Sequence, residues 1–156
     1  MTWRRRIEPF TRPIFFAVSR MTRGMTLGVR AVVTDQAGRV LLVKHTYLPG
    51  WWLPGGGVDR GEAVQAAAVR ELREEAGLIA VGEPRLISVH SNERFFPGDH
   101  VLLFRIDGYE VGERTSHGEI EAVDWFDVNA LPANVNRGCA ARLAEVFGGV
   151  GVSREW

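Results

Sequence analysis

The stretch Gly56–Leu78, GGVDRGEAVQAAAVRELREEAGL, decides how this sequence is interpreted. Within it, Glu71, Glu74 and Glu75 stand at positions i, i+3 and i+4. On a helix with about 3.6 residues per turn, this spacing places three carboxylates on one face. Such carboxylates repel one another unless a cation joins them, and hard cations such as Mg²⁺ and Mn²⁺ prefer oxygen-rich surroundings. The stretch therefore predicts a divalent metal beside a glycine-rich loop.

A charge-laced helix exposed to solvent is the alternative explanation. For Glu74 and Glu75 alone we would favour that alternative, because sequences rich in Glu and Arg are common on protein surfaces. The wider context changes the balance, since a motif gains weight when the surrounding residues agree with it. The residues that agree are Gly56, Glu62, Arg70, Glu71 and Gly77. We therefore favour metal binding.

The same stretch resembles the signature of the Nudix hydrolases at every defined position. That signature is Gly, five residues, Glu, seven residues, then Arg-Glu-aliphatic-any-Glu-Glu-any-Gly-aliphatic, with Leu72 and Leu78 at the aliphatic positions here. Nine specified positions over 23 residues make a specific match. The resemblance implies the Nudix fold, which is an α/β fold built as an α/β/α sandwich with a central mixed sheet.

The resemblance also implies roles for the acidic residues of the motif. Glu74 and Glu75 correspond to direct metal ligands, and Glu71 corresponds to a ligand or to the base that deprotonates the attacking water. The resemblance further places a backbone carbonyl of the loop on the metal, and we expect Gly56 to supply it. The metal is expected to be Mg²⁺, with Mn²⁺ as the alternative.

Two more residues are assigned to the catalytic group. Arg70 lies at i, i+4 from Glu74, so it is expected to hold the carboxylates in register through charge-assisted hydrogen bonds. The chain is also similar to MutT-type members, which carry a catalytic or metal-binding Glu six residues before a Trp. That similarity indicates Glu119, six residues before Trp125, although an exposed loop acid is nearly as good an explanation.

Aromatic and basic residues around the glycine-rich loop are candidates for substrate contact. Aromatic rings near a phosphate site suggest stacking on a base or a sugar, and arginines pair with phosphates. Glycine lets a ligand approach the backbone closely. The candidate substrate-binding residues are Arg30, His45, Trp51, Gly55, Gly56 and Phe96. An ordinary surface role explains Arg30 equally well, and we expect Trp52 to lie in the core.

The coarse pattern of elements agrees with an α/β domain whose sheet is covered on both faces. The predicted strands are 29–34, 39–44, 85–90, 100–106 and 121–126. The first two strands are expected to form a hairpin around a turn at 35–38. The stretch 61–76 predicts the main helix, ended by Gly77 in the left-handed conformation, and 138–147 predicts a terminal helix.

Composition indicates one compact domain, with 156 residues of which 46% are hydrophobic and 24% charged. The net charge is zero, so there is no global electrostatic case for binding nucleic acid or a membrane. Residues 1–30 nevertheless carry seven arginines against one acidic residue, a local net charge of +6. We expect a basic N-terminal helical leader over residues 1–25 and a Nudix hydrolase domain over residues 26–150.

The leader is expected to form an amphipathic helix that packs on the domain or on a second subunit, which would make a homodimer. A membrane-surface role is the alternative, but the apolar run at 13–18 is too short for a transmembrane segment. The single cysteine, Cys139, excludes an internal disulfide, fits a reducing cytoplasm, and is expected to be a small core residue. The predicted location is therefore cytoplasmic.

Together these features predict a Mg²⁺-dependent pyrophosphohydrolase that cleaves a phosphoanhydride bond in a nucleoside diphosphate linked to another moiety. The partner is a small-molecule nucleotide derivative, such as a nucleotide sugar, ADP-ribose or a nucleoside triphosphate, and not a nucleic acid. The alternative is a catalytically weak nucleotide-binding or sensing module of the same family. Resemblance implies that such modules usually lose motif glutamates, whereas Glu71, Glu74 and Glu75 are all present here.

Overall fold

The computed structural model describes residues 24–116 and 118–156. In chain order its elements are β1 (Thr26–Val33), β2 (Val40–His45), β3 (Trp51–Trp52), α2 (Val64–Ala76), β4 (Leu78–Val81), β5 (Arg85–Ser91), β6 (Asp99–Ile106), β7 (Gly108–Val111), β8 (Ile120–Phe126) and α3 (Arg137–Phe147). No helix in these ranges is long and apolar enough to cross a bilayer. The leader predicted over residues 1–25 lies outside the described residues, except for residues 24 and 25.

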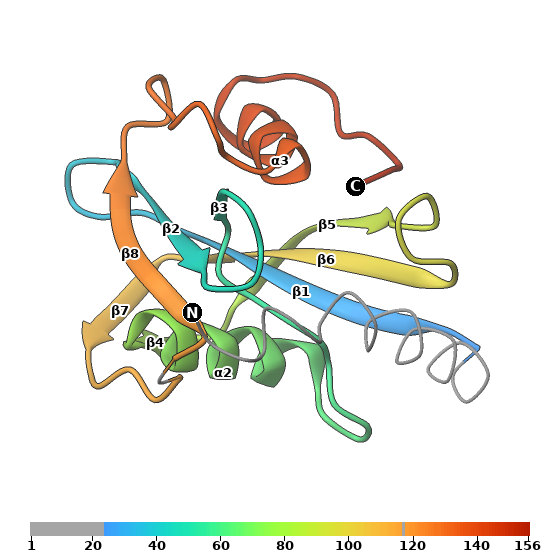
Figure 1. The fold of residues 1–156 in the computed structure, drawn as a ribbon, viewed down its shortest axis with the longest axis horizontal. Coiled ribbons are helices and arrows are strands. Elements are labelled where there is room, and N and C mark those ends of the chain that lie inside the picture. Colours follow the sequence, from blue (N-terminus) through green and yellow to red (C-terminus); the bar gives the residue numbers. More distant parts are fainter. Residues whose placement is uncertain (1–23, 117) are drawn as a thin grey trace.

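Within the described ranges, the strands form three small sheets between helices α2 and α3 (Figure 1). β1 and β6 run parallel, and β5 pairs antiparallel with β6, so the sheet β1-β6-β5 is mixed. A second sheet, β3-β2-β8, is antiparallel, and β4 pairs antiparallel with β7. Helix α2 lies on one side of the strands and α3 lies on the other (Figure 1). This arrangement confirms the predicted α/β/α sandwich with a mixed sheet.

The prediction that the first two strands form a hairpin is wrong, although the predicted turn between them forms. The turn itself forms, because the Asp35 carboxylate accepts hydrogen bonds from the backbone N–H groups of Ala37 and Arg39. A single antiparallel bridge joins Thr34 to Val40. After that bridge the chains part, since β1 pairs with β6 while β2 pairs with β3 and β8. The two strands therefore enter different sheets.

Helix α2 begins at Val64, later than the predicted start at residue 61. Its buried face is made of small residues and one large one, with Ala67, Ala68 and Leu72 almost fully buried. The helix ends at Gly77 as predicted, with a φ of 69° in the left-handed region and its N–H bonded to the Arg73 carbonyl. Close packing of the small face on β1 and β6 leaves the glutamates along one edge of the helix.

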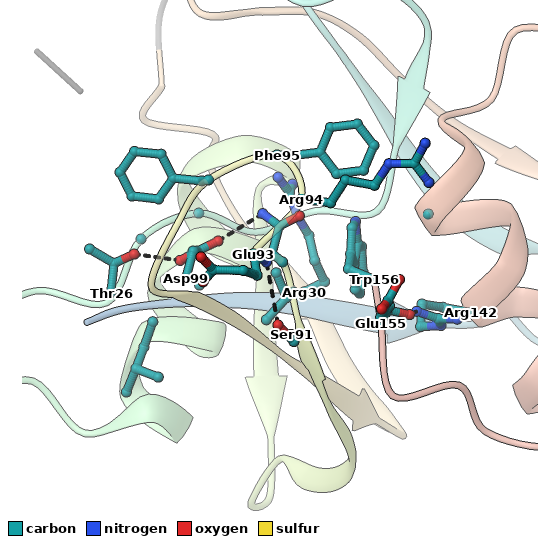
Figure 2. Close-up of a pocket in the computed structure, with 18 of the residues that line it drawn as sticks. Thr26, Arg30, Ser91, Glu93, Arg94, Phe95, Asp99, Arg142, Glu155 and Trp156 are labelled. Carbon is teal, nitrogen blue, oxygen red and sulfur yellow. Dashed lines mark hydrogen bonds between the residues drawn. The ribbon is translucent and has the colours of Figure 1, made fainter. Parts of the chain in front are cut away.

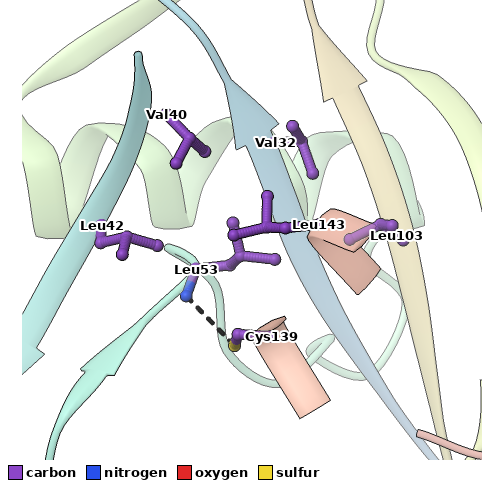
Figure 3. Packing of buried hydrophobic residues seen from close by; sticks show 7 residues of the cluster. All are labelled: Val32, Val40, Leu42, Leu53, Leu103, Cys139 and Leu143. Carbon is purple, nitrogen blue, oxygen red and sulfur yellow. Dashed lines mark hydrogen bonds between the residues drawn. The ribbon is translucent and has the colours of Figure 1, made fainter. Parts of the chain in front are cut away.

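The second helix, α3, covers the opposite face through a cluster of aliphatic side chains (Figure 3). Cys139 and Leu143 of α3 are buried there against Leu53, which follows β3. The Leu53 backbone N–H donates to Cys139 Sγ at 3.3 Å. Cys139 is therefore a core residue, as expected, and it fixes the chain just before the glycine-rich loop.

Candidate active site

The glycine-rich segment 54–58 lies antiparallel beside β1 and is held there through its backbone. The Ala31 N–H donates to the Pro54 carbonyl at 2.8 Å, and the Val29 N–H donates to the Gly56 carbonyl at 2.9 Å. The carbonyl of Gly56, which was assigned to the metal, is thus engaged in pairing with β1. The loop is therefore an ordered extension of the sheet and a rigid support for its neighbours.

Two glycines in this segment have no room for a side chain. Gly55 has a φ of 147°, and a Cβ at that position would collide with the Val29 carbonyl. At Gly56 a Cβ would lie 2.5 Å from Glu71 Oε1. The backbone at Gly56 therefore lies directly beside the Glu71 carboxylate of α2.

The three motif glutamates of α2 differ in their exposure to solvent. The side chains of Glu71 and Glu75 are only 13% and 9% exposed, whereas that of Glu74 is 42% exposed. Glu75 Oε2 accepts a hydrogen bond from the Gly55 N–H at 2.8 Å. The helix thus presents two carboxylates inward to the loop and one outward to solvent.

Arg70 ties the carboxylates together, as predicted from its spacing. Its Nε and Nη2 donate to both oxygens of Glu62, at 2.8 and 3.0 Å. Its Nη1 donates to Glu71 at 2.8 Å and to Glu74 at 3.3 Å, and Nη2 also donates to the Gly57 carbonyl at 3.0 Å. The hydrogen bonds from Arg70 lower the pKa of Glu62 to about 2, so Glu62 stays ionised.

Burial dominates the pKa values of the two inward carboxylates. It raises the pKa of Glu75 to about 7, opposed by the charge of Arg30 and by the Gly55 N–H bond. The neighbouring charges of Glu71 and Glu119 raise it further. Burial also raises the pKa of Glu71, although Arg70 opposes the shift. At both groups the effect of burial therefore outweighs that of the nearby positive charge.

Arg30, on β1, supplies part of that positive charge. Its Nη1 donates to the carbonyls of Leu53 and Gly55, each at 2.8 Å, and its guanidinium lies 5.3 Å from the centre of the Trp52 ring. The charge of Arg30 lowers the pKa of both Glu71 and Glu75. Arg30 is therefore an internal cation of the site, and the Gly55 carbonyl faces it.

His45 lies at the end of β2, where the register with β8 shifts. Only 3% of the residue is exposed, and its Nε2 lies 3.6 Å from Glu75 Oε1. Burial, with a smaller contribution from Arg30, lowers the pKa of His45 to about 4, so the imidazole is neutral at pH 7. The Tyr47 ring lies beside it, with centroids 5.2 Å apart. His45 thus belongs to the wall behind Glu75.

Glu119 joins the same region from the turn that precedes β8, the strand that pairs with β2. The Thr46 N–H donates to the Glu119 carbonyl at 2.9 Å, which places this residue next to the end of β2. Its charge makes a small contribution to the raised pKa of Glu75, after those of burial and Glu71. The residue predicted from its distance to Trp125 is therefore brought close to the motif carboxylates, although 44 residues separate it from Glu75 in the sequence.

The carboxylate oxygens of this site are suitable ligands for a hard divalent cation, but they do not converge on a single point. Among residues 24–116 and 118–156, no three His, Cys, Asp or Glu side chains converge closely enough to hold a metal ion. Two observations nevertheless favour a ligand here. The backbone of Gly56 lies directly beside the Glu71 carboxylate, and within the described part of the chain the buried Nε2 of His45 has no hydrogen-bond partner. Glu71, Glu74, Glu75 and Glu119 are the acidic residues that could close around a cation.

Both neighbouring tryptophans pack against the core cluster under α3, as predicted for Trp52 but not for Trp51. Trp51 packs edge-on against Phe126, with ring centroids 4.8 Å apart. Trp52 also lines a large cavity and lies beneath the Arg30 guanidinium. Trp52 therefore lies between the core and the cavity, whereas Trp51 does not line that cavity.

The large cavity lies between the glycine-rich loop, the loop that follows β5, and α3 (Figure 2). Arg30, Gly56 and Phe96 of the predicted substrate-binding residues line it, whereas His45 and Trp51 do not. The Gly55 carbonyl accepts a hydrogen bond from Arg30, but Gly55 is buried and does not line the cavity. The cavity adjoins the carboxylates through Arg30 and Glu62 and not through Glu71 or Glu75.

The C-terminal residues complete this cavity and were missed by sequence reasoning. The backbone of Ser91 in β5 accepts from the Trp156 N–H at 2.9 Å and donates to the Arg154 carbonyl at 2.8 Å. The Trp156 ring lies against Gly138, and the nearly buried Arg142 donates to the Glu155 carbonyl at 2.7 Å. The sequence of the segment 149–156 does not by itself predict that this segment packs here, because the packing depends on partners far away in the sequence.

In this sandwich a glycine-rich loop lies against a carboxylate-bearing helix, an arrangement suited to the class of enzymes that hydrolyse phosphorus-containing acid anhydrides with a metal ion. Residues 24–145 match the NUDIX domain, and the chain therefore belongs to the NUDIX family. It is accordingly a hydrolase of that class.

Relatives and solved structures agree with this assignment. A MutT-like protein from Streptomyces ambofaciens is 31% identical over 126 residues, which are 81% of this chain and 79% of the relative. The ADP-ribose pyrophosphatase of Methanocaldococcus jannaschii is 34% identical over 105 residues, 64% of this chain and 61% of the relative. The crystal structure of a MutT NUDIX hydrolase from Burkholderia pseudomallei superimposes with a TM-score of 0.68 at 26% identity, covering 78% of this chain and 98% of that one.

Proposed function

We propose that the chain is a divalent-metal-dependent pyrophosphohydrolase that cleaves a phosphoanhydride bond in a nucleoside diphosphate linked to another moiety. Mg²⁺ is the proposed metal, with Mn²⁺ as the alternative. The observation that carries the proposal is the contact of two nearly buried carboxylates, Glu71 and Glu75, with the backbone of the glycine-rich loop. Relatives named for nucleotide substrates, such as ADP-ribose and oxidized purine nucleoside triphosphates, support the nucleotide class.

The carboxylates divide into holding and proton-accepting roles. When bound, the divalent cation neutralises phosphate charge and acidifies a coordinated water. Glu75, fixed by the Gly55 N–H, and the exposed Glu74 would hold the cation from the inner and outer sides. Glu71 or Glu119 would accept the proton of the attacking water; the raised pKa of Glu71 favours that role. Arg70 keeps Glu71 and Glu74 in register.

The substrate would enter from the large cavity. Its phosphates would approach the backbone of Gly56 and the guanidinium of Arg30, which lines that cavity. A base or sugar would pack against Trp52 or Phe96, because both line the same cavity. Nucleotide sugars, ADP-ribose and nucleoside triphosphates all combine these chemical parts, so each belongs in the assay.

The test is turnover of Glu74→Gln on a panel of these nucleotide derivatives at saturating Mg²⁺. Because Glu74 is partly exposed, the substitution should leave the fold intact, as read by circular dichroism. We expect kcat to fall by a factor of about 100 or more, since a lost carboxylate weakens charge compensation in the transition state. Glu110→Gln, on the exposed face of β7, is the matched control and should retain turnover. Near wild-type turnover of Glu74→Gln would refute the proposal.

A further inference from the structure

The large cavity has room for more than one ring-bearing group. Its volume is about 2240 Å³, whereas a pocket that holds one drug-sized ligand measures about 300–1,000 Å³. Arg30 and Gly56, the groups proposed to meet the phosphates, line the cavity together with Trp52. Much of the remaining wall is made by α3 and by residues 149–156, which we call the C-terminal segment. These elements are therefore placed to contact a further part of the substrate.

The C-terminal segment is fixed in the cavity wall by α3 as well as by β5. The Ser153 N–H donates to Glu145 Oε1 at 2.9 Å, and the same oxygen accepts from Arg142 Nη2 at 2.6 Å. The Arg142 side chain is only 2% exposed, and its Nη1 donates to the Glu155 carbonyl. Because residues on both sides of Arg154 are held in this way, the ring of Trp156 is presented in a defined position.

Trp156 gives this part of the cavity an aromatic wall. Its ring packs on Gly138, where a Cβ would collide with the indole, and on the core cluster under α3. The Arg142 guanidinium lies 5.5 Å from the ring centre, whereas Arg30 lies over the ring of Trp52. Trp156 and Arg142 lie together beside α3 (Figure 2). The two indoles thus have separate surroundings, and each lines the same cavity.

The charged groups beside Trp156 suit an uncharged, hydroxylated ligand. The charge of the buried Arg142 is already balanced by Glu145, 2.6 Å away. Glu155 and Arg137 line the cavity as exposed residues of opposite charge. A carboxylate such as that of Glu155 accepts hydrogen bonds from hydroxyl groups but repels a phosphate. A sugar therefore fits this part of the cavity better than a further phosphate does.

We propose that Trp156 is the platform of a second ring-binding subsite, which takes a sugar carried by the second phosphate of a nucleoside diphosphate. The inference rests on the proposed function and narrows its substrate class to sugar-linked nucleoside diphosphates in preference to nucleoside triphosphates. The nucleoside would pack against Trp52 or Phe96, and the sugar against Trp156. Specificity would thus be set by the C-terminal segment, outside the residues 24–145 that match the NUDIX domain.

The test compares compounds that differ only in the group on the second phosphate. ADP-ribose and ATP share ADP, and UDP-glucose and UTP share UDP. With the full chain and Mg²⁺, KM is measured for each compound that is cleaved, and an inhibition constant for each that is not. In Trp156→Ala the constants for the sugar-linked compounds should rise about fivefold or more, through loss of the aromatic contact, and those for ATP and UTP less than about twofold. Trp156→Phe, which keeps an aromatic ring, should retain most of the affinity.

Val152→Ala is the matched control and should leave all constants unchanged. Val152 belongs to the same segment, is 60% exposed and does not line the cavity. An equal rise for both members of a pair in Trp156→Ala would show that the ring only supports the fold, and it overturns the inference. Unchanged constants, or wild-type turnover of nucleoside triphosphates without turnover of any sugar-linked compound, also overturn it and leave the proposed function standing. Absence of wild-type turnover on the whole nucleotide panel would instead overturn the proposed function.

Discussion

Glu75 should make the metal-free protein less stable as the pH rises, a direction opposite to that of an ordinary salt-bridged carboxylate. Burial raises its pKa from the model-compound value of 4.5 to about 7. Between these two pH values the folded state binds a proton that the unfolded state has released. The free energy of unfolding therefore falls as the pH rises from 4.5 through 7 and is constant above that range.

The size of the effect follows from the shift. Each unit of pKa corresponds to about 1.4 kcal/mol, so a rise from 4.5 to about 7 corresponds to roughly 3 kcal/mol at pH 8. Because Glu75 is only 7% exposed, solvent screening does little to reduce this value. His45 acts in the opposite direction, since its lowered pKa makes the protein more stable as the pH rises from about 4 to 6.5. A variant is therefore needed to isolate Glu75.

The contribution of Glu75 is isolated by comparing Glu75→Gln with the wild type in urea unfolding at pH 5 and pH 8, in the presence of EDTA. The glutamine can still accept the Gly55 N–H bond but carries no charge. We expect the variant and the wild type to have similar free energies of unfolding at pH 5, and the variant to be more stable by up to about 3 kcal/mol at pH 8. Glu110→Gln, exposed on β7, should show no such dependence. An identical wild-type-to-variant difference at both pH values would refute the reasoning.

Three further substitutions test the framework of the site. Arg70→Lys removes the planar fork that bridges the carboxylates, so urea unfolding should show a loss of about 1–2 kcal/mol. Gly55→Ala forces a side chain into the β1 backbone; we expect a loss of at least about 2 kcal/mol in thermal unfolding, whereas Gly57→Ala, with open space around it, should unfold like the wild type. Leu53→Ala empties a fully buried position and should cost about 3 kcal/mol in urea unfolding.

The helix that carries the motif could be predicted because its determinants are local. The i, i+3, i+4 spacing of the glutamates, the small residues Ala67 and Ala68, and the terminating Gly77 all act within a few turns of one helix. Arg70 reaches Glu71 and Glu74 within one turn of the helix for the same reason, whereas its bonds to Glu62 and to the Gly57 carbonyl reach residues that precede the helix. Resemblance to the family then supplied the surrounding sandwich, which periodicity alone would not have specified.

Pairings between distant segments could not be predicted in the same way. The strand 29–34 carries no local sign that its partner is β6 and not the strand that follows it across the turn. The core position of Trp51 has the same origin, because the side of a strand that meets the core depends on the elements packed against it. The same is true of Trp156, whose neighbours Ser91 and Gly138 lie in other elements.

The distribution of positive charge supports the proposal that the cation is held mainly at Glu75. Arg70 gives direct hydrogen bonds to Glu71 and Glu74, whereas within the described residues Glu75 accepts a hydrogen bond only from a backbone N–H and faces a neutral imidazole. Arg30 acts on Glu75 through its field, since its own Nη1 is bonded to two carbonyls. A nearly buried carboxylate with so little direct compensation gains the most from a bound cation. In the proposed enzyme, metal binding and deprotonation of Glu75 are therefore coupled, and metal affinity should weaken below the pKa of about 7.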